Sequence, residues 1–154
     1  MLNFTPVTAD AMTVMRPYYE KCPYRLCEYS AGVKYMWRGH LHSEYAFTDG
    51  CLVIRSCIDG VPQFDYPIPG PEGDVDAALA TIEDHCRRKG VRPIFSVVPE
   101  SEAGKLALRW PRVTITNERA WKDYLYHAED LAHFAGRHYS GQRNHINKFN
   151  KEHP

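Results

Sequence analysis

The sequence predicts an α+β domain in which helices flank a mixed central sheet. Three short β-rich segments follow one another over residues 42–70 and are separated by Asp-Gly pairs, a pattern typical of an antiparallel meander. An amphipathic helical pattern over residues 74–90 then leads into a further β-rich run at 92–99. That order is typical of a crossover unit, in which the two strands pair in parallel.

Length and composition are those of one globular domain. The chain has 154 residues, of which 44% are hydrophobic and 25% charged, and these values exclude a disordered, collagen-like or fibrous protein. No apolar run reaches the ~18–20 residues of a membrane helix, and the first residues lack a signal-peptide layout, so we expect a cytoplasmic protein. Nineteen basic residues balance nineteen acidic ones, and the five irregularly spaced cysteines are expected to be reduced.

The first forty residues contain two helical patterns. Thr8 precedes a segment whose apolar residues recur at helical spacing, which predicts a capped helix with a kink or an early end at Pro17. A second short helix is expected over residues 31–38, with Gly39 at its end.

The three β-rich segments span residues 42–50, 51–60 and 61–70, with Asp49-Gly50 and Asp59-Gly60 at the first two boundaries. Asp-Gly between such runs is the strongest short-range hairpin signal. The segments therefore predict a three-stranded antiparallel meander.

The clearest helix follows this meander. Asp74 is expected to cap it, three basic residues fill its last turn, and Gly90 ends it. Its apolar face comprises Val75, Ala78, Leu79, Ile82 and Cys86. Because the strand at 92–99 comes next, we expect it to pair in parallel with a meander strand.

Helical and extended patterns alternate over the rest of the chain. A helix over 101–110 is expected to precede a strand over 112–118 and an extended segment over 121–127. A short helix over 129–136 and a terminal helix over 138–154 complete the predicted elements.

Three common kinds of site are disfavoured. The cysteine spacings do not give the close ligand pairs of a zinc site, and no Gly-x-Ser-x-Gly nucleophile motif occurs. Gly70 and Gly73 precede the helix that Asp74 caps, where a phosphate could bind. The prolines of this loop remove backbone donors, and Glu72 adds negative charge, so a turn is favoured and a phosphate site is the alternative.

The terminal helix has two different faces. Tyr139, Ile146 and Phe149 form a stripe expected to face inward, whereas four basic residues against one acidic residue make segment 137–154 the basic end of the chain. Arg143 projects close to the apolar stripe, so it requires a partner. A structural ion pair is favoured, and an anion clamp in a cleft is the alternative. The candidate acidic partners are Glu28, Asp123 and Asp130.

Two strings resemble a known family. Residues 123–149, DYLYHAEDLAHFAGRHYSGQRNHINKF, are similar to the Asp-Tyr-x-Tyr … Arg-Asn-x-Ile-Asn-x-Phe signature of the lysyl-phosphatidylglycerol synthetase C-terminal domain family. Residues 27–38, CEYSAGVKYMWR, are similar to its Glu-containing segment that ends in an aromatic residue and Trp. The opening LNFTPVTADAM and the YPIPG loop fall in the same order, so the resemblance covers nearly the whole chain.

The resemblance implies a GNAT-like acyltransferase fold over residues 1–154, as the first half of a tandem pair. In relatives of known activity an aminoacyl group moves from a charged tRNA to an amine or hydroxyl acceptor. The acyl-CoA loop of GNAT enzymes is replaced by PIPGPEGD at residues 67–74. We therefore expect a half-domain that helps to shape a substrate cleft and is not catalytic on its own.

The resemblance also implies a site and partners. If the protein is active, it is expected to be an acyl or aminoacyl transferase whose donor is acyl-CoA or aminoacyl-tRNA, and no metal is expected. The expected partner is a second GNAT-like domain or another copy. A non-catalytic module whose basic terminal helix docks a protein or RNA is the alternative, and the prolines disfavour a self-sufficient acyl-CoA enzyme. The residues expected to bind substrate are Glu28, Trp37, Tyr124, Tyr126, Arg143 and Asn144.

Overall fold

The computed structural model describes residues 2–154, which form two compact units: the first ends at Thr116, and the second comprises residues 117–154. The first unit contains the sheet and four α-helices, and the second is helical. Among the described residues, no helix combines the length and hydropathy needed to cross a bilayer.

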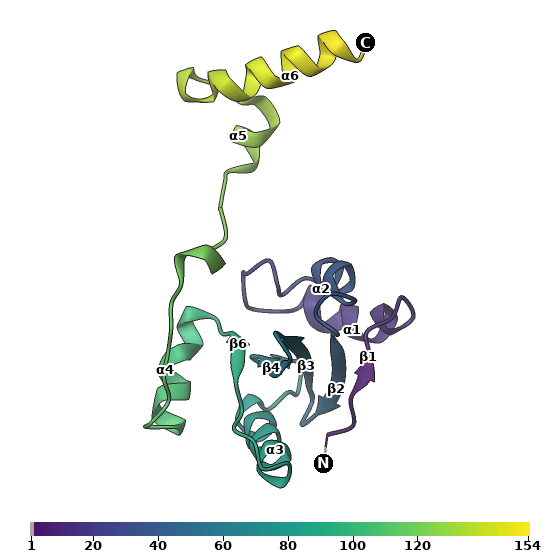
Figure 1. Ribbon diagram of the computed structural model, residues 1–154, viewed down its shortest axis with the longest axis vertical. Coiled ribbons are helices and arrows are strands. Elements are labelled where there is room, and N and C mark those ends of the chain that lie inside the picture. Colours follow the sequence, from purple (N-terminus) through teal and green to yellow (C-terminus); the bar gives the residue numbers. More distant parts are fainter. Residues whose placement is uncertain (1) are drawn as a thin grey trace. The chain divides into compact units, whose positions relative to one another are not determined.

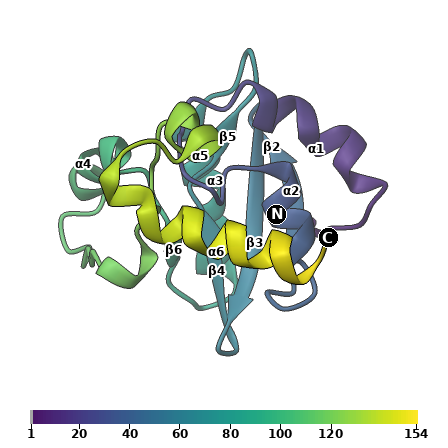
Figure 2. The ribbon, with the colours of Figure 1, turned by 90° about the horizontal axis from the view of Figure 1, so that it is seen from above.

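The first unit is an α+β fold around a mixed sheet that has six strands within the described residues (Figure 1). The sheet order is β1-β2-β3-β4-β6, with β5 paired to β3, and Figure 2 shows β2, β3 and β4 side by side. The helices are α1 (Ala11–Glu20), α2 (Ala31–Trp37), α3 (Val75–Arg88) and α4 (Glu100–Arg109). The strands are β1 (Thr5–Pro6), β2 (Glu44–Thr48), β3 (Cys51–Ile58), β4 (Val61–Asp65), β5 (Ile68–Pro69) and β6 (Phe95–Val97).

The predicted meander is confirmed, because β2, β3 and β4 pair antiparallel. Both Asp-Gly turns have left-handed backbone, with φ of 50° and 69° at Asp49 and Gly50 and of 52° and 78° at Asp59 and Gly60. Positive φ at both central residues matches the twist of a hairpin. β1 was not predicted, and β5 lies within the segment predicted as the third meander strand but pairs separately with β3; two residues are too few to show a periodic pattern.

The crossover unit is also confirmed. β4 and β6 pair in parallel, with an irregularity in the register at Phe64 and Asp65. Asp74 caps α3 as expected, since its Oδ1 accepts a hydrogen bond from the Ala77 N–H at 3.0 Å. The sheet is therefore mixed.

Alternate side chains of β3 enter different cores. Leu52 belongs to a cluster with Met15 of α1, whereas Val53 belongs to a second cluster with Ile82 of α3. This alternation follows from the two-residue period of a strand. The sheet is thus covered on both faces, and β3 is its most buried strand.

The N-terminal helix differs from its prediction at one point. Thr8 Oγ1 accepts a hydrogen bond from the Ala11 N–H at 3.3 Å, as expected of a cap. The early end at Pro17 is wrong, because α1 continues to Glu20. Pro17 removes one donor, while the buried Met15 and Tyr19 on either side of it hold the helix against the core.

The strand predicted over residues 112–118 is wrong for this chain. Residues 113–118 belong to no helix or strand, and all of them are exposed. The segment over 121–127 begins in the 3-10 helix η1 (Arg119–Trp121), and residues 122–127 form no helix or strand. A strand is stable only when a second strand takes its hydrogen bonds, so pattern alone did not decide this segment.

The second unit also contains α5 (Ala128–His133), the 3-10 helix η2 (Arg137–Tyr139) and α6 (Ser140–Glu152). No residue between 117 and 154 is buried. Ile146 and Phe149 of the predicted inward stripe are 43% and 61% exposed, so the stripe is not buried in this unit. Two short helices offer no second layer that could cover it.

Candidate functional site

The carboxyl ends of β4 and β6 form the candidate site. These strands are the parallel pair of the sheet, and ligands of open α/β sheets bind beyond the carboxyl ends of such strands. The ends carry Asp65 on β4 and Val97 on β6. Side chains from the loop over residues 21–30 and from α2 contact them.

A buried ion pair lies at this edge. Lys34 Nζ on α2 is 2.5 Å from Asp65 Oδ2, and the two side chains are 5% and 3% exposed. Burial raises the pKa of Asp65, while the Lys34 ammonium acts in the opposite direction. Since each charge is costly to bury alone, the pair ties α2 to the end of β4.

Tyrosine hydroxyls close the same edge. The Tyr29 hydroxyl donates to Val97 O at 2.8 Å and lies 3.3 Å from Tyr66 O, so it spans the ends of both parallel strands. The Tyr24 hydroxyl donates to Pro67 O at 3.4 Å. Burial raises the pKa of Tyr24 and of Tyr29, so both phenols stay protonated and act as donors.

The carboxylates of Asp65 and Glu102 already have partners, which limits the proton-transfer chemistry that this cluster can perform. Burial would raise the pKa of Glu102, but hydrogen bonds from Lys105 and from the Tyr66 hydroxyl lower it. Both carboxylates, Glu102 and Asp65, therefore already have cationic partners. A general base needs access to a substrate proton, whereas Asp65 is buried in its pair with Lys34 and Glu102 is held by Lys105 and the Tyr66 hydroxyl.

The loop before α3 packs against the turn between β2 and β3. The Gly70 N–H donates to Gly50 O, and the Asp74 N–H donates to Asp49 O, both at 2.9 Å. A Cβ on Gly50 would lie 2.9 Å from Glu72 O, so the turn and the loop pack without room for a side chain. The turn interpretation of this loop is confirmed, and these two donors are not free for a phosphate.

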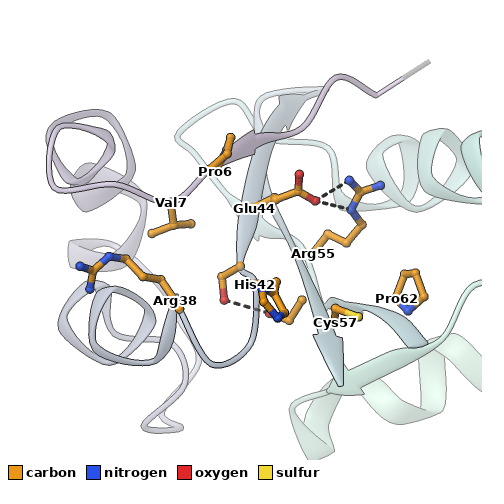
Figure 3. Close-up of a pocket in the computed structure, with 11 residues that line it drawn as sticks. Pro6, Val7, Arg38, His42, Glu44, Arg55, Cys57 and Pro62 are labelled. Carbon is orange, nitrogen blue, oxygen red and sulfur yellow. Dashed lines mark hydrogen bonds and ion pairs between the residues drawn. The ribbon is translucent and has the colours of Figure 1, made fainter. Parts of the chain in front are cut away.

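A cavity of about 590 Å³ opens near the amino end of β4, beside β1 and the α2–β2 connection (Figure 3). Figure 3 shows Glu44 and Arg55 pointing toward each other, and Arg55 Nε donates to Glu44 at 2.9 Å. Arg38 donates to Tyr35 O at 2.5 Å, and its guanidinium lies 3.7 Å from the Tyr35 ring centre. Both arginines therefore have partners, and none of the six residues expected to bind substrate lines this cavity.

Two of these six residues lie in the first unit. Glu28, in the loop before α2, is half-buried, and its charge acts on Asp65 and raises the pKa of that group. Trp37 ends α2, is 49% exposed and packs its ring edge against His40, with 5.9 Å between ring centres. Glu28 therefore interacts with the ion pair, and Trp37 contacts His40 just after the end of α2.

The other four residues lie in the second unit. Tyr124 and Tyr126 are 87% and 53% exposed, and their rings are stacked with centres 6.5 Å apart. Arg143 donates to Gly136 O at 2.8 Å and also to Phe134 O, so it binds the carbonyls that follow α5. Asn144 is exposed on α6.

Sequence reasoning missed Lys34, Asp65 and Tyr29 as site residues. A signal was present, since Lys34 lies within the apolar segment AGVKYMW and Asp65 lies between two aromatic residues. A charge inside an apolar run indicates a buried pair. That Lys34 and Asp65 are partners could not be predicted, because α2 and β4 meet only in the folded chain.

Comparisons with known proteins agree with the fold and extend it. The chain is similar to a solved structure described as a conserved protein of unknown function from Bacteroides thetaiotaomicron VPI-5482, with a TM-score of 0.84 and 25% identity. The match covers 99% of this chain and 51% of the other, so the chain spans about half the length of that protein. No curated protein matches the chain. The profile of the family described as "Phosphatidylglycerol lysyltransferase, C-terminal" matches residues 20–154, and the chain therefore belongs to that family.

Proposed function

We propose that this chain is the GNAT-like half of a protein of an acyl or aminoacyl transferase family. This half helps to shape a substrate cleft and is not catalytic on its own. The observation that carries this proposal is the family match over residues 20–154, which includes both strings of the sequence resemblance. The mixed sheet with its parallel pair at β4 and β6 supports a GNAT-like arrangement.

Two features of the first unit support a non-catalytic half. The turn at Asp49 and Gly50 accepts hydrogen bonds from the N–H groups of Gly70 and Asp74, in the loop before α3 where a diphosphate could otherwise bind. The carboxylate of Asp65 is paired with Lys34, so it is not free to accept a substrate proton. Transfer chemistry would then require groups from a second fold.

We also propose that the six residues expected to bind substrate contribute to this cleft. Glu28 lies beside the ion pair, where an amine of a substrate could meet its carboxylate. The stacked rings of Tyr124 and Tyr126 offer a platform for a planar group of the donor, such as a base of aminoacyl-tRNA. A second GNAT-like domain or another copy would complete the cleft, in line with the double length of the solved relative. The proposed location is the cytoplasm.

Thermal shift experiments test this function. The chain is heated with acetyl-CoA, a longer acyl-CoA or an aminoacyl-tRNA analogue, and a ligand at ~100 times its dissociation constant adds about 2.7 kcal/mol of stability. We expect no stabilisation by either CoA ester, because the loop before α3 is closed. A large shift with acetyl-CoA would contradict the proposal and favour a self-sufficient enzyme.

Arg143 provides an internal test of the same screen. If Arg143 is an anion clamp, Arg143→Met abolishes any ligand response while the fold survives. If it only binds the carbonyls of Phe134 and Gly136, the response is retained.

A second candidate function is a binding module that uses α6. Lys148 is 72% exposed, and Lys151 is exposed in the next turn, so the basic side is open to a partner. RNA binding through these residues would weaken as salt rises and would be lost in the Lys148→Glu, Lys151→Glu double variant. Binding that is independent of both lysines and of salt would exclude this mode.

A further inference from the structure

His85 of α3 is a buried titratable side chain that lies outside the candidate site. It is 3% exposed, and neither of its ring nitrogens has a hydrogen-bond partner among the described residues. A neutral imidazole occupies such a place at the cost of its unmade hydrogen bonds, whereas an imidazolium would be a buried and unpaired charge. The closed fold therefore favours the neutral form of His85.

The charged groups that act on His85 reinforce this preference. Burial is the largest influence that lowers its pKa, and Lys89 at the end of α3, Arg55 on β3 and the α-amino group of the chain act in the same direction. Asp84 acts in the opposite direction, but it is itself paired with Arg88 at 2.7 Å. A proton is therefore taken up more readily when His85 is exposed to water, where its pKa is about 6.5.

The N-terminal segment packs against His85. The ring of Phe4 meets the imidazole edge-on, with 5.6 Å between ring centres, and the Arg55 guanidinium lies 4.1 Å from the centre of the same Phe4 ring. Leu2 is 7% exposed and belongs to the same apolar cluster as Cys86 of α3. Residues 2–6 are thus attached to α3 through Leu2 and Phe4.

Few other contacts hold this segment. β1 comprises only Thr5 and Pro6, both of them exposed, and it forms the edge of the sheet beside β2 (Figure 1). Pro6 has no N–H to donate to the ladder. A short exposed edge strand opens at a lower free energy than the centre of a sheet, so residues 2–6 are a part of the first unit that can detach locally.

We propose that residues 2–6 form a strap that detaches from α3 and β2 when His85 takes up a proton. Detachment gives the imidazolium access to water and removes the cost of burying its charge beside Phe4. Pro6 and Arg55 line the cavity of Figure 3, so detachment also removes part of the cavity wall. The proposal concerns a conformational device and does not depend on transfer chemistry.

The direction of the pH dependence follows from the two states of His85. Its pKa is lowered in the closed state and ordinary in the open state, so the strap is fully stable above about pH 6.5 and loses stability as pH falls below that value. One proton is taken up. Between about pH 7 and about pH 5.5 the equilibrium constant for detachment should therefore rise, by up to about eightfold.

Native-state hydrogen exchange at these two pH values, in increasing low concentrations of urea and corrected for intrinsic rates, tests the strap. We expect residues 2–6 to exchange through an opening that has a lower free energy and a weaker urea dependence than the opening of β3, and that is more populated at the lower pH. Equal free energies and urea dependences for residues 2–6 and β3 would mean that only global unfolding occurs, and would overturn the proposal. A segment without protection at about pH 7 is not docked, and would overturn it as well.

Variants test whether His85 is the group responsible. His85→Leu takes up no proton, so detachment of the strap should no longer depend on pH. Lys89→Gln removes an exposed cation that opposes protonation, raises the pKa of His85 in the closed state and should reduce the rise in detachment. Lys21→Gln is the matched control, since Lys21 is an exposed lysine at the same position after α1, and it should leave the rise unchanged. A rise that persists in His85→Leu, or that Lys21→Gln reduces as much as Lys89→Gln, overturns the proposal.

Discussion

Lys34 and Asp65 form an ion pair of 2.5 Å between α2 and the end of β4, with 5% and 3% of their side chains exposed. Asp65 also interacts electrostatically with Glu28 and with Tyr29, whose hydroxyl spans the ends of β4 and β6. Because both charges are withdrawn from water, each depends on the other. This relationship ties a helix of the N-terminal half to the parallel strands of the sheet.

Removing one partner should therefore be costly. Lys34→Met leaves a buried carboxylate without a counter-charge and should lower the free energy of unfolding by about 3–5 kcal/mol. Chemical denaturation measures the loss. The double variant Lys34→Met, Asp65→Leu should recover much of it, since no charge is then buried. Arg16→Met serves as the control, because the Arg16–Glu20 pair is 71% and 59% exposed and should contribute less than about 1 kcal/mol.

The cap of α3 should be measurable by one substitution. Asp74→Ala removes the acceptor of the Ala77 N–H and should lower stability by about 0.5–2 kcal/mol. Asp74→Asn retains an oxygen acceptor and should cost less. Urea denaturation midpoints provide the comparison, and an unchanged midpoint in Asp74→Ala would count against the cap.

The two Asp-Gly turns differ in what surrounds them. Gly50→Ala and Gly60→Ala both place a side chain at positive φ, at a cost of about 1–2 kcal/mol. Only Gly50 would also bring its Cβ to 2.9 Å from Glu72 O, whereas nothing lies within 4 Å of the Cβ position at Gly60. Gly50→Ala should therefore lower the thermal midpoint more. Equal losses would show that the turn does not pack on the loop before α3.

His85 should make stability depend on pH. Its side chain is buried, 3% exposed, with its ring edge on Phe4, and burial together with Lys89 and Arg55 lowers its pKa below the ordinary value of about 6.5. A lowered folded-state pKa means that the unfolded chain binds a proton first, so stability is retained above about pH 6.5 and is lost as pH falls below it. Denaturation at pH 7 and pH 5 should show this loss, and His85→Leu should reduce it. Identical pH slopes would contradict the assignment.

Arg143 should stabilise the junction between α5 and α6. Arg143→Met removes the donors to Phe134 O and Gly136 O, so amide exchange in α5 and at the start of α6 should become faster. Lys148→Met, on the exposed side of the same helix, provides the control and should leave those amides unchanged. If exchange is equal in both variants, the carbonyl contacts do not hold the junction.

The local elements could be predicted because their signals lie within a few neighbouring residues. Asp49-Gly50 and Asp59-Gly60 imposed the hairpins through their backbone preferences, and the periodic apolar face between Asp74 and Gly90 specified α3. The two segments that resemble the family, residues 27–38 and 123–149, could be recognised for the same reason. The prediction that Arg143 lies on a helix was correct. Its partners, the carbonyl oxygens of Phe134 and Gly136, could not be predicted, because they depend on how the chain turns after α5.

The sequence by itself determined the meander, the crossover order and the chain's family, since hairpin turns, caps and periodicity act between residues that are close along the chain. Only the tertiary structure decided that Lys34 meets Asp65, that the Asp49-Gly50 turn packs on the loop before α3, and that residues 113–118 form no strand. Each of these outcomes depends on groups distant in sequence. A buried charge needs a counter-charge, and a strand needs a neighbouring strand. The segment that needs such a partner does not itself show which distant residues supply it.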